Sequence, residues 1–224
     1  MLTLKASFEK NGYACVPTAV SEELCSALAE SLASTEDAGS RCLLGEPLVA
    51  SLVQYLRSQS PVATLLPANS VAVQCSLFSK SESSNWLVPP HQDLSIPVAE
   101  RVPSTDCSGW SDKQGLLFVQ PPAELLAQLV AVRVQLDVPS RQSGELHVAP
   151  GTHKLGRIPA SSVSSIAPLS SMQPCQVPRA GALVMRPLLA HASRKAATGT
   201  LRRVLHLLFG PPVLSHGLRW GSAV

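Results

Sequence analysis

Apolar side chains recur at two different spacings along the chain, and the change of spacing divides it into a helical part and a β-rich part. Three leucines at helical spacing follow Ser21, and they are Leu24, Leu28 and Leu32. Ser21 is a residue type that favours the start of a helix, and two glutamates fill the first turn. A second helical stretch covers about 46–58. We expect these N-terminal helices, within about 1–60, to buttress a sheet.

Beyond residue 70 the pattern changes to short apolar runs separated by turns rich in Pro, Gly and Ser. The runs are Val71–Phe78, Gly115–Val119, Val130–Val138, Glu145–Val148, Gly181–Met185 and Val204–Phe209. Many short strands of this kind predict an antiparallel sandwich or jelly roll rather than alternating strands and helices. The predicted fold class is therefore mainly β with flanking helices. Ser161–Ser171 is predicted to be a loop, and residues 97–114 a surface loop or a mobile lid.

Composition agrees with one domain over residues 1–224, because 45% of the residues are hydrophobic and a chain of this length buries a sizeable core. No apolar run is long enough to cross a bilayer, and no apolar leader follows a basic start. The six cysteines are scattered without a C-x-x-C pair, so a disulfide framework is not expected. We expect a cytoplasmic monomer that does not bind a membrane.

Charge is distributed unevenly although the net charge is only +3. Residues 1–145 carry nine basic and fifteen acidic residues, a balance of −6, whereas 146–224 carry nine Lys and Arg and no acid. A positive C-terminal part favours a small anionic ligand. Nucleic acid is disfavoured as a partner, because the basic residues are spread over several elements and aromatic residues make up only 4% of the chain.

The segment Pro89-Pro90-His91-Gln92-Asp93 is the first candidate for chemistry. Side chains two apart on an extended segment leave the same face, so His91 and Asp93 are placed as a pair of metal ligands. Alternatively, Asp93 caps a turn and His91 is half exposed. A third ligand would complete a 2-His-1-carboxylate face that leaves opposite positions open, as suits non-haem Fe(II). His191 is the candidate, and its rivals are His147, His153, His206 and His216.

An ordered set of motifs over nearly the whole chain resembles the phytanoyl-CoA dioxygenase family of Fe(II)/2-oxoglutarate oxygenases. The matching segments are Phe8–Tyr13, Leu77–Lys80 leading through Asn85-Trp86 to His91-Gln92-Asp93, Gly144–His153, and Gly181–Pro187 leading through His191 to Arg202–Leu205. No single piece is specific, but the order is. The resemblance implies a double-stranded β-helix, the cupin-like form of the jelly roll.

The resemblance also implies the site. It selects His191 as the partner of His91 and Asp93 on Fe(II), and it assigns Arg202 and Ser193 to the cosubstrate 2-oxoglutarate. His153 is then expected to close a turn after Pro150-Gly151, and His147 to face solvent. The implied reaction consumes dioxygen, releases succinate and carbon dioxide, and hydroxylates a small or medium-sized metabolite. The chain is shorter than many relatives, which argues against phytanoyl-CoA as its substrate.

Only one arginine of the Arg202-Arg203 pair enters the barrel, because neighbours on a strand point to opposite faces. Family spacing from His191 favours Arg202, and the alternative for either arginine is a solvated edge position. Several further polar and aromatic residues lie in or near predicted strands without an assigned role. They are Gln74, Lys80, Trp86, Trp110, Gln120 and His206.

Two other classes of function stay open. One is a jelly-roll hydrolase or isomerase that uses the same three ligands with Zn(II) or Mn(II), and the presence of Arg202 and Ser193 disfavours it. The other is a binding module that keeps the barrel but has lost turnover. The three classes differ in what they require: the oxygenase needs iron and 2-oxoglutarate, the hydrolase needs only a metal, and the binding module needs neither.

Overall fold

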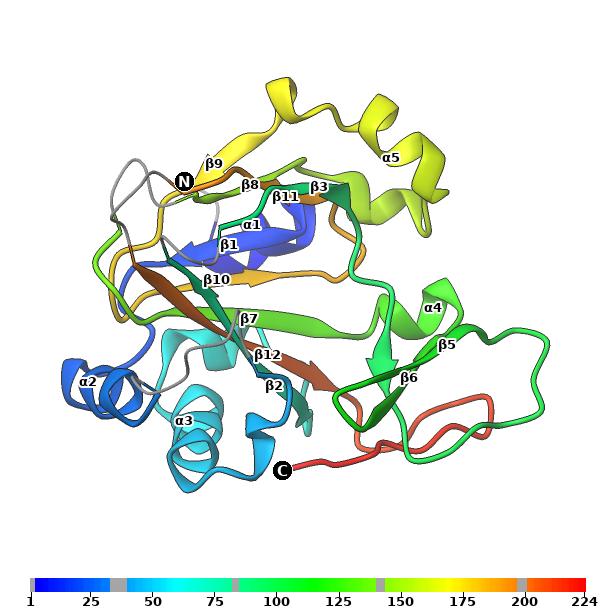
Figure 1. The fold of residues 1–224 in the computed structure, drawn as a ribbon, viewed down its shortest axis with the longest axis horizontal. Coiled ribbons are helices and arrows are strands. Elements are labelled where there is room, and N and C mark those ends of the chain that lie inside the picture. The colour runs from blue at the N-terminus through cyan, green and yellow to red at the C-terminus, as the bar shows by residue number, and fades with distance from the viewer. Residues whose placement is uncertain (1–2, 33–39, 82–84, 140–143, 197–200) are drawn as a thin grey trace.

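The computed structural model describes residues 3–32, 40–81, 85–139, 144–196 and 201–224 (Figure 1). Its helices are α1 Leu4–Asn11, α2 Glu22–Ser31, α3 Pro47–Ser58, α4 Ala123–Leu126 and α5 Ala160–Ile166. Its strands are β1 Tyr13–Val16, β2 Val71–Lys80, β3 Val88–His91, β4 Ile96–Pro97, β5 Ser108–Lys113, β6 Leu116–Gln120, β7 Val130–Gln135, β8 Leu146–Val148, β9 Gln173–Cys175, β10 Ala182–Met185, β11 His191–Ser193 and β12 Arg202–Gly210.

The strands form three sheets in which every pairing is antiparallel. The major sheet has the order β1-β10-β7-β12-β2, and the minor sheet has the order β3-β11-β8-β9. The two lie one above the other in Figure 1, and a third sheet, β4-β6-β5, extends from one end. Each apolar run expected to form a strand does so, and the predicted jelly-roll class, mainly β with flanking helices, is confirmed.

Strand β12 shows why the sequence folds as two layers, because alternate side chains serve different purposes. Leu205, Leu207 and Phe209 are buried in the core shared with the N-terminal helices. The even-numbered residues Arg202, Val204, His206 and Leu208 line a cavity between the sheets. This period of two is the ordinary alternation of a β-strand.

Helices α2 and α3 cover the outer face of the major sheet (Figure 1). The Ser21 hydroxyl accepts a hydrogen bond from the backbone N–H of Leu24 at 3.2 Å, which caps α2 as its sequence predicts. Helix α3 begins at Pro47, a residue whose fixed φ suits the first helical position. Buried leucines from both helices, including Leu28, Leu52 and Leu56, pack in this core.

Two segments differ from the expectation. The predicted loop Ser161–Ser171 contains most of α5, whose Val163 packs over Ala190 and Ala192 on the outer face of the minor sheet. The range 97–114 contains β5, which forms a hairpin with β6, so about a third of the expected loop or lid belongs to this strand. Both segments are polar, and their structure depends on partners distant in sequence.

Candidate metal centre and cavity

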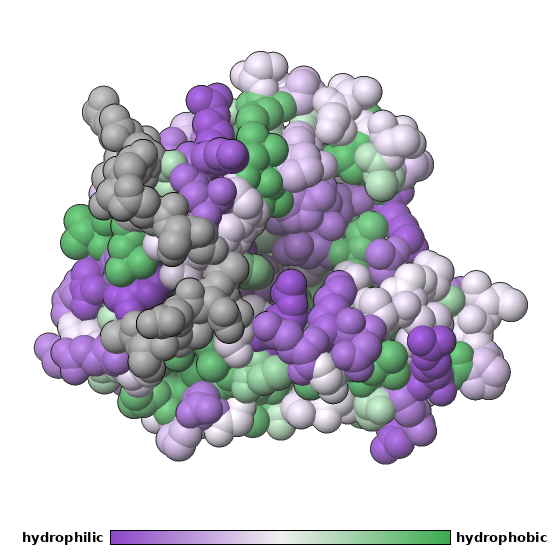
Figure 2. All heavy atoms as spheres, viewed as in Figure 1, coloured by the Kyte–Doolittle hydropathy of each residue, from purple (hydrophilic) through white to green (hydrophobic). Residues whose placement is uncertain are grey.

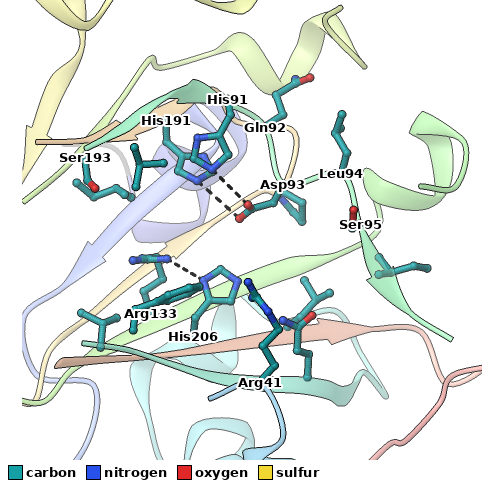
Figure 3. A pocket seen from close by; sticks show the side chains of 18 of the residues that line it. Arg41, His91, Gln92, Asp93, Leu94, Ser95, Arg133, His191, Ser193 and His206 are labelled. Atoms are coloured by element: carbon teal, nitrogen blue, oxygen red, sulfur yellow. Dashed lines mark hydrogen bonds and ion pairs between the residues drawn. The ribbon is translucent and has the colours of Figure 1, made fainter. Parts of the chain in front are cut away.

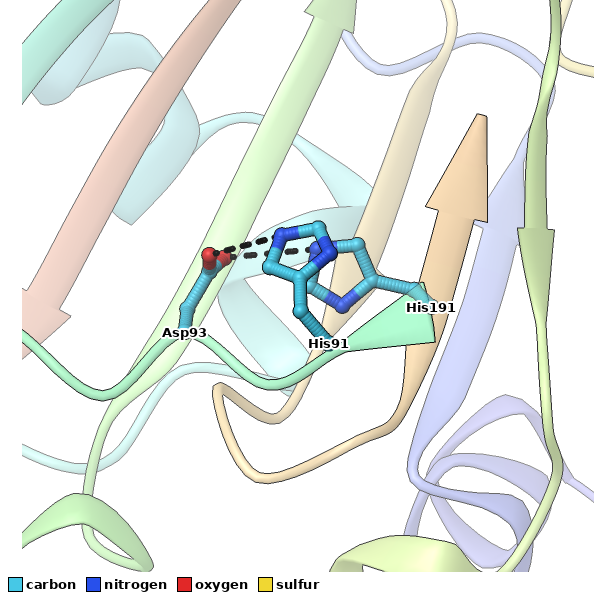
Figure 4. A group of neighbouring side chains, drawn as sticks. All are labelled: His91, Asp93 and His191. Carbon is cyan, nitrogen blue, oxygen red and sulfur yellow. Dashed lines mark ion pairs between the residues drawn. The ribbon is translucent and has the colours of Figure 1, made fainter. Parts of the chain in front are cut away.

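His91, Asp93 and His191 meet at one point although a hundred residues separate the two histidines. His91 ends β3, His191 begins β11, and the two are direct partners in the antiparallel pair. The Nε2 atom of His91 lies 3.6 Å from Asp93 Oδ1, and that of His191 lies 3.7 Å from Asp93 Oδ2. Candidate ligand atoms of the three residues all lie within 4.8 Å of one another (Figure 4). This compact 2-His-1-carboxylate group can hold a divalent metal ion.

Backbone carbonyls orient both imidazoles. The Nδ1 atom of His91 lies 2.9 Å from the Pro89 carbonyl oxygen, and the Nδ1 atom of His191 lies 2.9 Å from the Leu189 carbonyl oxygen. Because a carbonyl only accepts hydrogen bonds, each Nδ1 carries the proton and each Nε2 keeps its lone pair. Both lone pairs then belong to the nitrogens nearest Asp93, as metal binding requires.

Gln92 anchors the segment that carries the ligands. Its buried amide donates hydrogen bonds to the carbonyl oxygens of Leu188 at 2.6 Å and Gly156 at 2.9 Å, and it accepts one from Ile158 N–H at 2.8 Å. The backbone N–H of Asp93 donates to the Pro187 carbonyl at 2.9 Å. Gln92 therefore positions its two neighbours, a role that the sequence alone did not reveal.

Electrostatics keep His191 and Asp93 in the states that bind metal, whereas His91 is held by Asp93 in a way that favours its protonated form. Burial lowers the pKa of His191 to about 4, so its imidazole is neutral near pH 7. Burial alone would raise the pKa of Asp93, but the adjacent histidines outweigh it and hold that pKa well below its usual range. Burial likewise opposes charge on His91, and its hydrogen bond to Asp93 still raises its pKa. A neutral imidazole and an ionised carboxylate are the forms that coordinate a metal.

The three ligands face a cavity of about 440 Å³ between the two sheets. In Figure 2 the surface is hollowed there, and hydrophilic side chains gather around the hollow. The His191 side chain is only 3% exposed, whereas those of His91 and Asp93 are 37% and 35% exposed, so the group is open on one side. Most of the candidates from the sequence line this cavity: Gln74, Lys80, Trp86, Gln120, Ser193, Arg202 and His206. Trp110 does not; it packs against the core, with Arg101 over its ring.

Lys80, Ser193 and Arg202 form one corner of the cavity. Lys80 and Arg202 are partners in the β2–β12 pair, and Lys80 Nζ donates to Ser193 Oγ at 2.9 Å and to the Arg194 carbonyl at 2.7 Å. Burial, followed by the nearby arginines, lowers the pKa of Lys80 to about 8. Arg202 Nη1 donates to the Gly144 carbonyl at 2.8 Å. The corner combines two cations and a hydroxyl, a set that suits a carboxylate.

Arg203 points the other way, as strand alternation predicts. Its guanidinium pairs with Asp137, with Nη2 2.7 Å from Oδ1 and Nε 3.2 Å from Oδ2, and it also donates to the Ala29 carbonyl at 2.7 Å. This arginine thus links β12 to the helical layer. It is a structural residue rather than a solvated edge residue.

His206 and Arg133 lie opposite Asp93 across the cavity (Figure 3). Arg133 Nη1 lies 2.9 Å from His206 Nδ1, which must accept because a guanidinium only donates. Burial and the Arg133 charge lower the pKa of His206 to about 3, so His206 is neutral. Arg133 was not singled out from the sequence. The sequence does hold one indication of its role. Arg133 is the single cation in the apolar run Val130–Val138, and strand alternation turns its side chain to the inner face of the sheet.

The remaining histidines lie outside the metal centre. His147 pairs with Ala192 on β11, so it faces the side of the sheet opposite to His191, and it is buried rather than solvent-facing as expected. His153 lies in a short 3-10 helix directly over Gly12, where an added Cβ would be 2.3 Å from its Nδ1 atom. His216 contacts Asp106 and Glu124 at 3.5 and 3.7 Å.

The cations of the cavity do not come mainly from the basic C-terminal part. Of the nine Lys and Arg in residues 146–224, only Arg202 lines the cavity. The other cavity cations belong to the acidic N-terminal part, and they are Arg41, Lys80, Lys113 and Arg133. Counting charge by halves therefore predicted the sign of the charge in the cavity but not its source, because the fold gathers cations from five separate segments.

Within the described ranges, no helix has the length and apolar character needed to span a membrane. The family model described as phytanoyl-CoA dioxygenase (PhyH) matches residues 8–204. A search among curated proteins found no match.

Solved structures with the same fold are similar over most of this chain. Iron-bound HygX from Streptomyces hygroscopicus has a TM-score of 0.65 at 16% identity, covering 94% of this chain and 87% of that one. The non-heme monooxygenase ThoJ has a TM-score of 0.67 at 17% identity, with coverage of 99% and 82%. The alpha-ketoglutarate-dependent epimerase SnoN from nogalamycin biosynthesis has a TM-score of 0.58 at 16% identity, with coverage of 93% and 82%. At these identities the likeness establishes the fold.

Proposed function

This chain belongs to the phytanoyl-CoA dioxygenase family, and from that premise we propose that it is an Fe(II)- and 2-oxoglutarate-dependent oxygenase. The observation that carries the proposal is the orientation of His91, Asp93 and His191, whose candidate metal-binding atoms lie within 4.8 Å of one another in the lining of one cavity. The proposed reaction is hydroxylation of a small or medium-sized molecule. HygX, which shares the fold, has been crystallised with nickel and 2-oxoglutarate and also with hygromycin B, which supports a small-molecule substrate.

The donor set fits Fe(II) better than a closed structural metal site. Two neutral imidazoles and one carboxylate occupy one face of the ion and leave the opposite positions open for other ligands. Bound iron supplies the dioxygen chemistry, in which 2-oxoglutarate is converted to succinate and carbon dioxide while a substrate C–H bond is hydroxylated. The protein contributes orientation and the exclusion of water.

The corner formed by Lys80, Ser193 and Arg202 would hold the distal carboxylate of 2-oxoglutarate. Arg202 uses one N–H on the Gly144 carbonyl, and its remaining donors can make parallel charge-assisted bonds to a carboxylate. Ser193 already receives a hydrogen bond from Lys80, so its hydroxyl proton is directed elsewhere and is available to the same carboxylate. Cosubstrate binding would thereby place the keto acid end toward the metal ligands.

Apolar side chains would shield the reacting end of the substrate. Around the metal ligands the cavity wall includes Val88, Leu94, Ile96, Phe118 and Leu126. A wall of this kind strengthens the electrostatic interactions inside it and keeps water from reactive species. The volume of about 440 Å³ fits a small or medium-sized molecule together with the cosubstrate.

The test is an anaerobic titration of the metal-free protein with Fe(II) and then 2-oxoglutarate, followed by its visible absorption. The proposal expects a metal-to-ligand charge-transfer band that requires both additions and is absent from His91→Ala. His216→Ala, a histidine outside the cavity, is the matched control and should keep the band. A folded protein that binds metal but gives no band would indicate a metal-dependent hydrolase or isomerase. A folded protein that binds no metal would indicate a binding module.

The charge-transfer band does not report which product is formed from the substrate, so the product needs its own measurement. SnoN, a neighbour in fold, is described as an alpha-ketoglutarate-dependent epimerase, so this fold is not confined to hydroxylation. Product analysis by mass spectrometry separates the two, because hydroxylation adds one oxygen atom and epimerisation leaves the mass unchanged. We propose hydroxylation because the phytanoyl-CoA dioxygenase family is named for dioxygenase chemistry.

A further inference from the structure

The cavity carries more positive charge than iron and 2-oxoglutarate account for. Among the described residues, its lining has five basic side chains and a single carboxylate, Asp93. The dianionic cosubstrate balances the charge of Fe(II), and Lys80 with Arg202 more than offsets Asp93. Three cations of the cavity, Arg41, Lys113 and Arg133, then remain in excess, and none of them forms an ion pair with a described carboxylate. Unpaired cations in a partly desolvated cavity are unfavourable unless a ligand neutralises them.

Arg41 and Lys113 are held next to each other by the backbone. The Arg41 N–H donates to Gln114 Oε1 at 2.8 Å, and Cys42 Sγ lies 3.5 Å from the Gln114 carbonyl oxygen. Gln114 follows Lys113 directly in the turn of the β5–β6 hairpin. On its other side, the same segment is tied to β2 through the Ser40 carbonyl, which accepts from Leu77 N–H at 2.7 Å. The placement is therefore part of the fold and does not depend on free side-chain rotation alone.

Neither side chain forms an ion pair within the described part of the chain, although Lys113 lies near enough to Asp93 to feel its charge. Arg41 makes no ion pair there, and the Lys113 ammonium lies 4.9 Å from the centre of the Phe118 ring. Burial and then the Arg41 charge lower the pKa of Lys113 despite the opposite effect of Asp93, which agrees with two cations close together. Exposed cations usually avoid such a pairing, because like charges repel.

This pair lies away from the proposed 2-oxoglutarate corner. The backbone of Cys42 forms an isolated parallel β-bridge with that of Cys75 on β2. Cys75 is five residues before Lys80, which is about 16 Å along an extended strand. In Figure 3, Ser193 lies to the left, beside His191, whereas Arg41 lies below Asp93, on the side of His206. A five-carbon dicarboxylate anchored at the Lys80 corner does not extend to Arg41. The second set of cations thus faces the side that is left for the substrate to be oxidised.

We propose that this substrate carries a carboxylate or phosphate group, held between the guanidinium of Arg41 and the ammonium of Lys113. The inference rests on the oxygenase function proposed above and adds the chemical class of the substrate. A guanidinium makes two parallel hydrogen bonds to such an anion, and an ammonium adds a third charged donor. Held at one end in this way, the substrate directs an uncharged carbon toward the metal ligands and past the apolar wall that includes Phe118.

The experiment uses the full chain, both metal-free and loaded anaerobically with Fe(II) and 2-oxoglutarate. Binding is followed by calorimetry with two matched pairs, butyrate against butyramide and glycerol 3-phosphate against glycerol. The proposal expects at least one anion to bind about tenfold or more tightly than its neutral partner, because the neutral partner forfeits the charge-assisted bonds. The anion that gains more affinity over its neutral partner shows whether the substrate carries a carboxylate or a phosphate.

Variants locate the binding. Arg41→Gln and Lys113→Gln should each weaken the preferred anion about tenfold or more, and Arg41→Lys should retain part of the affinity, because it keeps the charge but loses the bidentate geometry. Arg101→Gln and Lys154→Gln remove exposed cations outside the cavity and should bind like the wild-type protein. Circular dichroism verifies that each variant is folded.

Three results would overturn the inference: neither anion binds better than its neutral partner, the Arg41 and Lys113 variants bind as tightly as the wild type, or the anion displaces 2-oxoglutarate. The charge-transfer band, recorded in the same samples, reports separately on the proposed function. A missing band with anion binding that depends on Arg41 would refute the oxygenase but leave the anion site. A normal band with no anion preference would refute the anion site alone.

Discussion

His91 and His191 face each other as direct partners across the β3–β11 pair, with their ring centroids 4.2 Å apart. Each ring is fixed by the carbonyl two residues before it, and Asp93 lies within 3.7 Å of both Nε2 atoms. Strand pairing therefore sets the geometry of the proposed metal centre before any metal binds. Preorganisation of this kind lowers the cost of binding.

Removing one ligand should abolish tight iron binding without unfolding the protein. For His191→Ala we expect Fe(II) affinity, measured by anaerobic calorimetry, to fall by more than about 100-fold, since changes to residues that merely support a ligand already cost about 10 to 100-fold. His147→Ala is the matched control, because His147 is also buried, lies on the neighbouring strand and faces the opposite side. Equal losses in the two variants would contradict the assignment of His191.

Gln92 should matter for both stability and metal affinity. Gln92→Ala leaves the carbonyls of Leu188 and Gly156 and the N–H of Ile158 without their partner. We expect a loss of about 2–4 kcal/mol in the free energy of unfolding, measured with urea, and iron binding about tenfold weaker. Gln128→Ala, which removes an exposed amide bonded to the Glu124 carbonyl, should change neither quantity appreciably.

Substituting the two neighbouring arginines of β12 should have different effects, one on cosubstrate binding and the other on stability. Arg202→Ala should weaken 2-oxoglutarate about 100-fold, the value of two charge-assisted hydrogen bonds, while iron binding is retained. Arg203→Ala breaks the ion pair between Arg203 and Asp137, whose two side chains are only 13% and 15% exposed. This substitution should lower the free energy of unfolding by about 3 kcal/mol and leave the cosubstrate affinity unchanged. Undiminished keto acid binding in Arg202→Ala would remove this residue from the cosubstrate site.

The stability of the metal-free protein should fall as the pH is lowered from about 6.5 toward 4. His206, with a folded pKa of about 3, and His191, with one of about 4, both lie below the unfolded value of about 6.5. The unfolded state therefore binds more protons in this window, and stability rises with pH there. Asp93 adds its own loss only below about pH 4, where an unfolded aspartate protonates.

His206→Gln isolates one of these contributions, because glutamine can still accept a hydrogen bond from Arg133. We expect the slope of unfolding free energy against pH, measured with urea between pH 4.5 and 6, to decrease by about 1.4 kcal/mol per pH unit. His153→Gln is a weaker comparison, since burial lowers the pKa of that histidine less strongly. An unchanged slope in His206→Gln would mean that His206 is protonated in the folded protein.

Local sequence patterns predicted the elements whose structure they control. Helical spacing after Ser21 identified α2, because burial on one side leaves a periodic signature, and the short apolar run 204–209 identified β12. Strand alternation also predicted that the side chains of Arg202 and Arg203 point to opposite faces of the sheet. The placement of His91, Asp93 and His191 in one group followed from the family resemblance, since no local pattern connects residues that are a hundred positions apart.

The features that sequence reasoning missed depend on tertiary contacts. Helix α5 is rich in serine and has one buried side chain, Val163, so its pattern resembles a loop. Strand β5 is polar and is stabilised by pairing with β6. Arg41 lies in the cavity because Gln114 binds its backbone, and nothing near Arg41 in the sequence indicates that contact.

Strand β12 carries two sets of requirements in nine consecutive residues. Its odd-numbered side chains complete the packing beneath α2 and α3, and its even-numbered ones include Arg202 and His206 at the cavity. A mutation that shifts the strand by a fraction of an ångström to relieve one layer displaces the other, so neither layer can drift independently during evolution. New substrate preferences should therefore arise at Arg41, at the β5–β6 hairpin and at other positions on the rim of the cavity, while β12 stays nearly constant.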